Sequence, residues 1–185
     1  MIFTETPVAG AYVIDVKRIG DDRGFFGRLW CEKEMADMGL VSVIRQSNIG
    51  VSPQAGTLRG LHYQTPPHQE VKIIRCPRGA IYDVVVDLRP ESRTFRQWFA
   101  VELTAGNSRM LYVPEGCATG YQTLVDDTEI YYHTSEFYHP ECATGVRYND
   151  PAFGIEWPLP VTAISDNDTG WQDFRAPEAH QGERT

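Results

Sequence analysis

The stretch VKIIRCPRGAIYDVVVDLR, residues 71–89, holds two apolar runs separated by Pro-Arg-Gly at 77–79. Within these runs apolar side chains recur at about every second position, which is the pattern of β-strands. A proline and a glycine between two such runs mark a tight turn. The stretch therefore predicts two consecutive strands joined by a turn, and it is the clearest structural signal in the chain.

The same alternation recurs on both sides of this stretch. Further strands are predicted at residues 11–19, 96–104, 108–116 and 128–138. Turn-forming residues separate the strands at 89–92, 104–107, 114–116 and 126–127. Only the segment WCEKEMADMGL, residues 30–40, carries a helical pattern, and it is short. Many short strands with hardly any helix predict an antiparallel sandwich or barrel.

Length and charge limit the classes of protein to consider. The 185 residues suffice for one hydrophobic core, so we expect one domain at 1–172 and a polar C-terminal tail at 173–185. The formal charge of −8 argues against nucleic acid or an anionic membrane as a partner. There is no signal-peptide pattern and no apolar segment of about 18 residues, so we expect a cytoplasmic protein.

The segment RGLHYQTPPHQEVK, residues 59–72, concentrates ionisable groups. These groups could bind a metal ion or transfer protons to and from a substrate. A metal site in a barrel usually uses two histidines at alternate positions of one strand, a carboxylate, and a histidine from a facing strand. Here His62 has no such neighbour, and the facing segment VPEGCATGYQTL carries Thr119 instead. His68 follows two prolines and is expected on a turn with no chemical role. The pattern therefore favours proton transfer over a catalytic metal.

A lone strand histidine is more often a satisfied core residue than a base, so the residues near His62 matter. Lys72 begins the next predicted strand, where a cation can stabilise a developing enolate. Strict strand alternation would place His62 on one face with Leu58 and Gly60, and Arg59 on the other face with Leu61 and Tyr63.

Eight segments, in chain order, then carry a resemblance to a known family: DDRGFF (21–26), RQSN (45–48), TLRGLHYQ (57–64), residues 71–95, YVPEGCATGYQTL (112–124), FYHP (137–140), NDPAFGIEWP (149–158) and ISDND (164–168). Together they resemble the dTDP-4-dehydrorhamnose 3,5-epimerases, cupin-fold enzymes that act on nucleotide-linked 4-keto-6-deoxy sugars. The resemblance implies an all-β, cupin-type antiparallel jelly-roll barrel with minor short helices, in one epimerase domain. It also implies a homodimer with exchanged N-terminal strands.

The resemblance also implies a catalytic set: His62, Lys72, Tyr138 and Asp168. In this set His62 removes the proton next to the C4 ketone, with Asp168 as its partner. Lys72 stabilises the enolate oxygen, and Tyr138 returns a proton from the opposite face. Inversion at carbon needs an acid and a base on opposite sides of the ring. Spacing alone does not distinguish Tyr138 from Tyr131 or Tyr132.

Seven more positions match family positions that meet the substrate: Arg23, Phe26, Arg28, Gln46, Asn48, Arg59 and Thr119. The forked guanidinium groups of Arg23 and Arg59 suit a diphosphate, and Gln46 and Asn48 match positions that seat the nucleotide end. Two positions depart from the family pattern. Thr119 replaces a histidine in the usual G-x-A-H-G-F, and Arg28 replaces a glutamate.

The sequence thus predicts a metal-independent isomerase without a cofactor. Its predicted reaction inverts C3 and C5 of a nucleotide-diphospho-4-keto-6-deoxy sugar through enolate intermediates, as in the conversion of dTDP-4-dehydro-6-deoxyglucose to dTDP-4-dehydrorhamnose. The alternative within enzymes is a nucleotide-sugar 3-epimerase or ketoisomerase of the same fold with another base or sugar. A non-catalytic sugar-nucleotide binding module and a metal-dependent oxygenase are weaker alternatives, because the four acid-base residues are all present.

Overall fold

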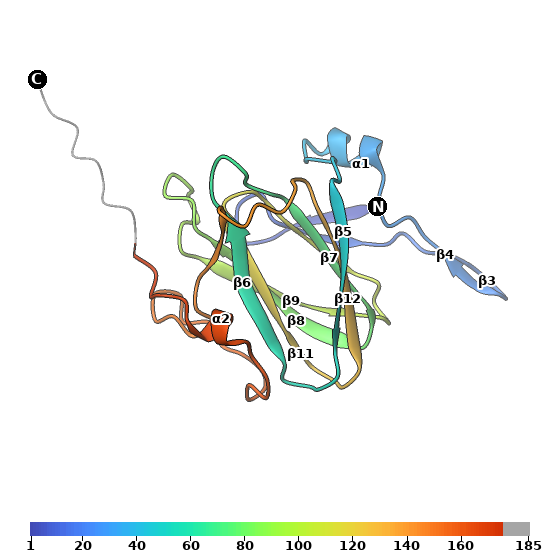
Figure 1. The fold of residues 1–185 in the computed structure, drawn as a ribbon. Coiled ribbons are helices and arrows are strands. Elements are labelled where there is room, and N and C mark those ends of the chain that lie inside the picture. Colours follow the sequence, from blue (N-terminus) through green and yellow to red (C-terminus); the bar gives the residue numbers. More distant parts are fainter. Residues whose placement is uncertain (176–185) are drawn as a thin grey trace, which may run out of the picture.

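Two antiparallel sheets face each other in the computed structural model, which describes residues 1–175 (Figure 1). One sheet has six strands in the order β1 (Ile2–Glu5), β2 (Tyr12–Asp15), β10 (Met110–Val113), β7 (Lys72–Arg78), β12 (Thr128–Thr134) and β5 (Gln46–Ser52). The other has five in the order β13 (Ala143–Gly145), β6 (Leu58–Gln64), β11 (Cys117–Thr123), β8 (Ala80–Asp87) and β9 (Trp98–Thr104). The predicted all-β antiparallel jelly-roll barrel is confirmed.

The two strands of residues 71–89 do not pair with each other. β7 lies in the six-stranded sheet and β8 in the five-stranded sheet, so the turn between them carries the chain from one layer to the other. Gly79 makes this turn with φ of +81°, and a Cβ atom there would lie 2.4 Å from Thr128 Oγ1. A larger residue would be strained by its backbone and would also collide with β12.

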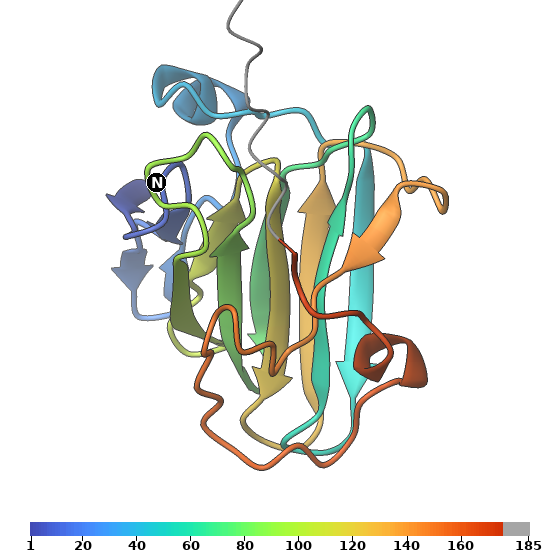
Figure 2. The ribbon, with the colours of Figure 1, turned by 90° about the vertical axis from the view of Figure 1, so that its left-hand side faces the viewer.

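β8 is covered on both faces, which explains its nearly continuous apolar sequence. Ile81 and Val85 point into the core between the sheets, whereas Val84 and Val86 pack beneath the C-terminal segment. Figure 2 shows that segment, orange to red, crossing in front of the five-stranded sheet. The cover that such a strand requires therefore comes from the chain's own C-terminal residues, including Phe153.

The predicted helix is confirmed as α1 (Glu32–Asp37), which packs Met35 onto the outer side of the six-stranded sheet. A second short helix, α2 (Asp166–Thr169), was not predicted. A hairpin of β3 (Ile19–Asp21) and β4 (Gly24–Phe26) projects from the body of the molecule (Figure 1).

The predicted strand at 128–138 is too long, because β12 ends at Thr134. Beyond it, three consecutive backbone N–H groups donate to side chains rather than to a neighbouring strand. Phe137 N donates to Glu136 Oε1 at 2.7 Å, and the next two donate to Gln46 Oε1 and Gln64 Oε1, each at 2.6 Å. Side chains thus replace the ladder, and residues 135–142 form a loop.

Near the C-terminus, Phe174 packs against Phe95 and Phe153. Residues 176–185, most of the predicted polar tail, lie outside the described residues, so the boundary at 172 stays a prediction. Among residues 1–175 no helix is long and apolar enough to cross a membrane.

Candidate active site

Two adjoining cavities of about 560 and 540 Å³ open between the sheets. The first lies among β5, β6, β7, β8, β11 and β12, and residues 163–168 close one side of it. The second extends along β6, β12 and β13 to the 135–142 loop. Four residues line both cavities: His62, Lys72, Tyr132 and Asn167. Each cavity has the size of a typical small-molecule site, and together they suit an elongated ligand.

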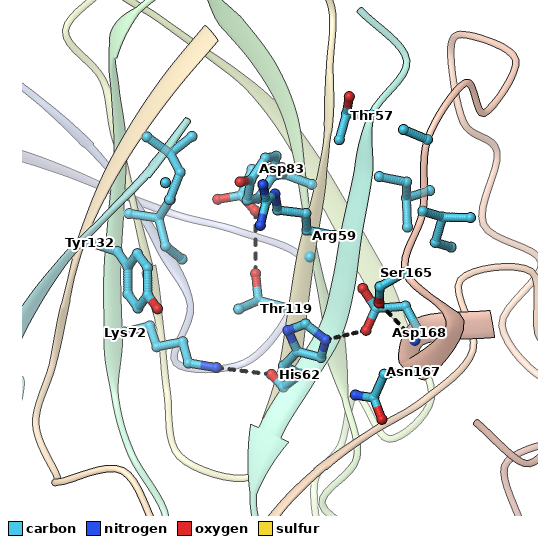
Figure 3. Close-up of a pocket in the computed structure, with 18 of the residues that line it drawn as sticks. Thr57, Arg59, His62, Lys72, Asp83, Thr119, Tyr132, Ser165, Asn167 and Asp168 are labelled. Atoms are coloured by element: carbon cyan, nitrogen blue, oxygen red, sulfur yellow. Dashed lines mark hydrogen bonds and ion pairs between the residues drawn. The ribbon is translucent and has the colours of Figure 1, made fainter. Parts of the chain in front are cut away.

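His62 of β6 is paired with a buried carboxylate. Its Nε2 donates to Asp168 Oδ1 at 2.5 Å (Figure 3), and the backbone N–H of Gly60 donates to Asp168 Oδ2 at 3.2 Å. The Asp168 side chain is 5% exposed, whereas that of His62 is 44% exposed. Because Nε2 faces the carboxylate, Nδ1 is the nitrogen left to accept a proton from a ligand. The predicted pairing of these residues is therefore present in the structure.

The charge of Asp168 is held by its surroundings. Burial, the largest influence, would raise the pKa of Asp168, but the hydrogen bond and charge of His62, with the Gly60 N–H, outweigh it and lower that pKa. α2 places the residue, because the side chain of Ser165 caps the helix by accepting from Asp168 N at 3.1 Å. The sequence ISDND thus supplies both the carboxylate and its local support.

Lys72 lies close to His62 and is largely buried. Its Nζ donates to His62 O at 3.1 Å and pairs with Glu70 Oε1 at 3.0 Å. Glu70 is 8% exposed and its Oε2 has no hydrogen-bond partner among the described residues. The ammonium is therefore fixed in the cavity wall beside the histidine, where it can meet an oxygen that becomes negative. Sequence analysis had not singled out Glu70.

Strict alternation does not hold along β6. Arg59 and His62, three positions apart, both line the first cavity. Between them the register of β6 against β11 shifts, and Gly60 adopts φ of +133°. A Cβ atom on Gly60 would lie 2.4 Å from Gly120 Cα, so only glycine permits this approach. This irregularity brings the arginine and the histidine to the same face.

Thr119 of β11 stands opposite His62 in the sheet register. Its hydroxyl donates to Val84 O at 2.8 Å and to Asp83 Oδ1 at 3.3 Å. Asp83 is 1% exposed and lines the first cavity, and its Oδ2 has no hydrogen-bond partner among the described residues. Burial raises the pKa of Asp83 to about 8, although Thr119 and Lys72 act in the opposite direction. Burial therefore favours the uncharged form of this carboxyl in the site.

Tyr132 and Tyr138 border the cavities in different ways. Tyr132 on β12 lines both cavities and comes from the sheet opposite His62, and burial raises the pKa of its phenol. The predicted acid, Tyr138, is 65% exposed and lines only the second cavity. Its backbone N–H is bound by Gln46, which lines the second cavity together with Asn48.

The structure does not bring three of the predicted substrate-facing residues to these cavities. Arg23 and Phe26 lie on the projecting hairpin, where Arg23 pairs with Asp21 and Phe26 is 70% exposed. Arg28 pairs with Glu34 of α1 at 2.7 Å. None of the three lines either cavity within this chain.

A histidine backed by a carboxylate and flanked by a buried lysine, in a cavity of a two-sheet barrel, defines an acid-base enzyme of the cupin class. The chain belongs to the dTDP-4-dehydrorhamnose 3,5-epimerase family, whose model matches residues 5–176. The resemblance noted in the sequence is thereby confirmed.

Individual relatives agree with this assignment. A dTDP-4-dehydrorhamnose 3,5-epimerase of Sinorhizobium fredii is 40% identical over 174 residues, which cover 91% of this chain and 87% of that one. The crystal structure of the enzyme from Bacillus anthracis, with TDP and PPi bound, has a TM-score of 0.90 and 39% identity, covering 94% of this chain and 99% of that one.

A third relative carries a related activity. It is a double mutant of ChmJ, a 3'-monoepimerase from Streptomyces bikiniensis, crystallised in complex with dTDP. The two structures match with a TM-score of 0.83 and 30% identity, over 91% of this chain and 85% of that one.

Proposed function

We propose that this chain inverts C3 and C5 of a nucleotide-diphospho-4-keto-6-deoxy sugar by proton transfer. The observation that carries the proposal is the pair of His62 and Asp168, with the Lys72 ammonium beside it, in a cavity between two sheets. The family supports the same reaction. Both carbons are adjacent to the C4 ketone, so one base and one oxyanion-stabilising cation serve both inversions.

In each half of the reaction His62 takes the proton from the carbon next to the ketone. The electron pair of the broken C–H bond moves toward the C4 oxygen and forms an enolate. Asp168 stabilises the imidazolium that results, because its carboxylate already accepts from Nε2. Lys72 stabilises the enolate oxygen by charge and hydrogen bonding. A proton delivered to the opposite face of that carbon completes the inversion and restores the C4 ketone. His62 then releases its proton to solvent and the acid regains one from solvent, so that both groups are ready for the second half.

The acid that delivers this proton is Tyr132 in our proposal, instead of Tyr138. A sugar ring between the sheets would have His62 on one face and Tyr132 on the other, because these residues come from opposing sheets. In the double mutant of ChmJ, the altered histidine and tyrosine are seventy positions apart in that chain. His62 and Tyr132 are also seventy positions apart. Tyr138, exposed in the 135–142 loop, is better placed to contact the nucleotide end.

Paired phenylalanine variants separate the two tyrosines. Tyr132→Phe should lower kcat by about a hundredfold or more, as loss of a general acid does. Tyr138→Phe should mainly raise KM, because it removes a binding contact. The reverse pattern would return the acid role to Tyr138, as the sequence predicted.

The experiment that tests the reaction is solvent exchange. The chain is incubated in heavy water with dTDP-4-dehydro-6-deoxyglucose, and deuterium at C3 and C5 is followed by NMR. We expect incorporation at both carbons and a loss of about a thousandfold in rate for His62→Ala. Unchanged exchange in that variant would remove His62 as the base.

Exchange at C3 alone would favour the second candidate, a 3-epimerase. Two observations support the 3-epimerase as an alternative: the structural match to the 3'-monoepimerase, and Thr119 in place of the family's usual histidine. The same NMR experiment decides between the two, because each carbon is observed separately. No exchange at either carbon, with dTDP-dependent thermal stabilisation, would favour a non-catalytic binding module.

We also propose that the chain works as a homodimer in which the hairpin of one copy completes the site of the other. The hairpin exposes three large apolar side chains, Ile19, Phe25 and Phe26, by 66%, 52% and 70%. Exposed apolar residues on a projecting element are typical of an interface. The proposal also explains why Arg23 lies outside the cavities of its own chain.

Mixing two weakly active variants tests this arrangement. A heterodimer of Arg23→Ala and His62→Ala would contain one site with both native residues, so random pairing restores about a quarter of the sites. The mixture should regain activity after subunit exchange, while each variant alone stays weakly active. A monomer by sedimentation, or a mixture that regains nothing, would contradict the exchanged arrangement.

A further inference from the structure

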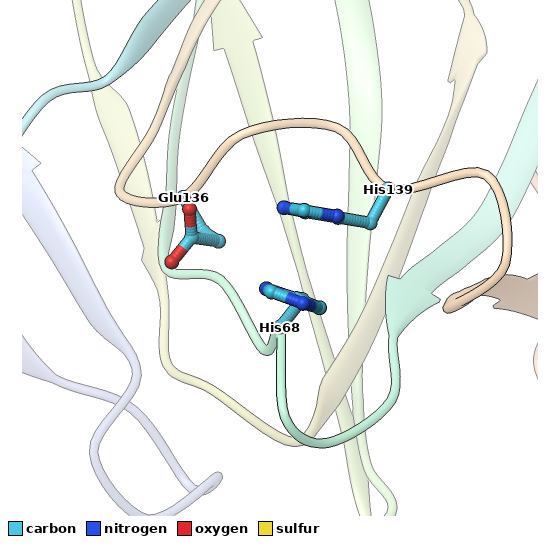
Figure 4. A group of neighbouring side chains, drawn as sticks. All are labelled: His68, Glu136 and His139. Atoms are coloured by element: carbon cyan, nitrogen blue, oxygen red, sulfur yellow. The ribbon is translucent and has the colours of Figure 1, made fainter.

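A cluster of three side chains lies at the edge of the second cavity and takes no part in the proposed reaction. His68 follows β6, and Glu136 and His139 belong to the 135–142 loop after β12 (Figure 4). The ligand atoms of the three side chains all lie within 4.8 Å of one another. Each side chain is partly buried. Residues distant in the sequence thus place two imidazoles and a carboxylate together.

We propose that His68, Glu136 and His139 bind a zinc ion that clamps the two loops at the entrance of the cavity. Two imidazoles and a carboxylate are a common donor set for Zn²⁺, with a water in the fourth position. Oxygen-seeking ions such as Mg²⁺ and Ca²⁺ would bind poorly, because they prefer carboxylates, carbonyls and water.

The hydrogen bonds of His139 and Glu136 leave on each residue one atom that can bind a metal ion. His139 Nδ1 lies 3.2 Å from Glu141 Oε1, so that carboxylate orients the ring and leaves Nε2 for the metal. A carboxylate behind a ligating histidine is the usual support of a zinc site. Glu136 accepts from Phe137 N through Oε1, which leaves Oε2 for the ion. Among residues 1–175, Glu136 forms no salt bridge that would compete.

The backbone beneath the cluster is already fixed. Gln64 is 6% exposed and its side chain joins both loops. Its Nε2 donates to His68 O at 2.8 Å and to Phe137 O at 3.1 Å, and its Oε1 accepts from His139 N at 2.6 Å. An ion would therefore bind side chains whose main-chain positions need little rearrangement.

The two imidazole rings are stacked, with centroids 3.4 Å apart and planes 10° from parallel. Two nitrogens bound to one tetrahedral zinc lie about 3.3 Å apart, whereas the ligand atoms of the cluster lie within 4.8 Å of one another, so zinc binding would have to bring them closer. Each lone pair lies in its ring plane, however, so stacked rings do not converge on one ion. Rotation about the Cβ–Cγ bond of His68 would correct this, and that torsion is soft in histidine.

An ion at this position would restrain one wall of the second cavity. Glu136 and His139 lie on either side of Tyr138, so an ion held by both restrains the segment that carries this tyrosine. Tyr138 and Glu136 both line the second cavity. Zinc would therefore reduce the motion of the loop at the nucleotide end of the site, without contacting His62 or Lys72.

Calorimetric titration of the chelator-treated full chain with zinc chloride tests the site. We expect one ion per chain, with binding weakened at least tenfold in His68→Ala and in Glu136→Gln. Two histidines of residues 1–175 lie outside the cluster and serve as matched controls: His62→Asn and His133→Ala should bind zinc as the native chain does. Two cluster variants are used so that misfolding of one does not decide the result.

Hydrogen exchange gives a second readout that does not depend on activity. Zinc should slow exchange of the amides in residues 135–142 in the native chain and leave them unchanged in His68→Ala. The proposal is overturned by no binding, by native-like binding in both cluster variants, by loss of binding in a control variant, or by binding that leaves these amides unaffected. Because no substrate is present, none of these results bears on the epimerase reaction, which is assayed with chelator.

Discussion

Two buried aspartates on the same strand, β8, have opposite surroundings. Asp87 is 0% exposed, and its carboxylate accepts from Arg89, Ser92 and Thr94 at 2.5 to 2.8 Å. Asp83, four positions earlier, is 1% exposed and has the Thr119 hydroxyl as its side-chain partner. Burial is the largest influence on both groups and by itself raises both pKa values. The hydrogen bonds of Asp87 outweigh it and lower its pKa to about 2, whereas the pKa of Asp83 rises to about 8.

The difference shows that hydrogen-bond partners, rather than burial, decide in which direction the pKa of a buried carboxyl shifts. Asp87 fastens the loop after β8, because its partners belong to the turn that leads to β9. Asp83 faces the cavity beside Thr119 and keeps one oxygen without a partner among the described residues. A buried polar atom without a partner is costly, and such cost concentrates at functional sites.

The largest expected effect is the loss of stability when Asp87 is replaced. Asp87→Ala should lower the free energy of unfolding by about 3–5 kcal/mol, because it leaves the Arg89 guanidinium without its buried partner. Urea denaturation of native and variant chains at pH 7 measures the difference. A loss below about 1 kcal/mol would mean that the hydrogen bonds of Asp87 do not stabilise the loop after β8.

The second prediction concerns the pH dependence contributed by Asp83. The pKa of this carboxyl is raised in the folded chain, from 3.8 to about 8. Its stabilising contribution is therefore complete below pH 3.8 and falls as the pH rises toward 8, by up to about 1.4 kcal/mol per pH unit. Asp83→Asn should remove this slope and leave the variant more stable than the native chain near pH 8. Parallel stability curves for the two proteins between pH 5 and 8 would contradict the neutral state of Asp83.

A smaller effect should follow the removal of one partner of Asp87. Ser92→Ala deletes a hydrogen bond to a charged group and should lower the free energy of unfolding by about 1.5–3 kcal/mol. It should also raise the pKa of Asp87. The native contribution of Asp87 is present above pH 3.8 and is lost as the pH falls toward 2, so acid unfolding of the variant should begin at a higher pH. An unchanged acid midpoint would contradict this account.

The smallest effect is expected for the partner of Asp83. Thr119→Val keeps the shape of the side chain and removes the hydroxyl that donates to Asp83 and to Val84 O, at a cost of about 1 kcal/mol. Because that hydroxyl lowers the pKa of Asp83, its loss should raise this pKa further and extend the slope above pH 8. If the fall in stability with rising pH ended at a lower pH in the variant than in the native chain, the Thr119 hydroxyl would raise the pKa of Asp83 rather than lower it.

Much of the fold could be predicted from local pattern, because strand alternation is a property of neighbouring residues. Local pattern predicted three kinds of feature: the strands around residues 71–89, the helix at 30–40 and the turn at His68. One failure of the pattern has a distant contact as its cause. β12 is shorter than predicted because Gln46 and Gln64 bind the backbone beyond Thr134.

The site shows the same division. The catalytic set was predicted by residue type and motif, and three of its members, His62, Lys72 and Asp168, lie together in the first cavity. Glu70 and Asp83 were missed, although each places an ionisable side chain in or beside an apolar run, which is a sequence signal of a buried functional group. Tyr132 was left among three tyrosines, because choosing requires knowledge of which sheet faces His62.

The sequence by itself determined that this chain forms an antiparallel β barrel and that it carries the residues of a nucleotide-sugar epimerase family. Only the tertiary structure decided that β7 and β8 belong to opposite sheets, that Arg59 joins His62 across a register shift, and that the pKa values of two aspartates of one strand shift in opposite directions. The physical reason is range. Alternation and turns depend on adjacent residues, whereas burial, hydrogen-bond partners and pKa depend on residues that folding brings together from distant positions.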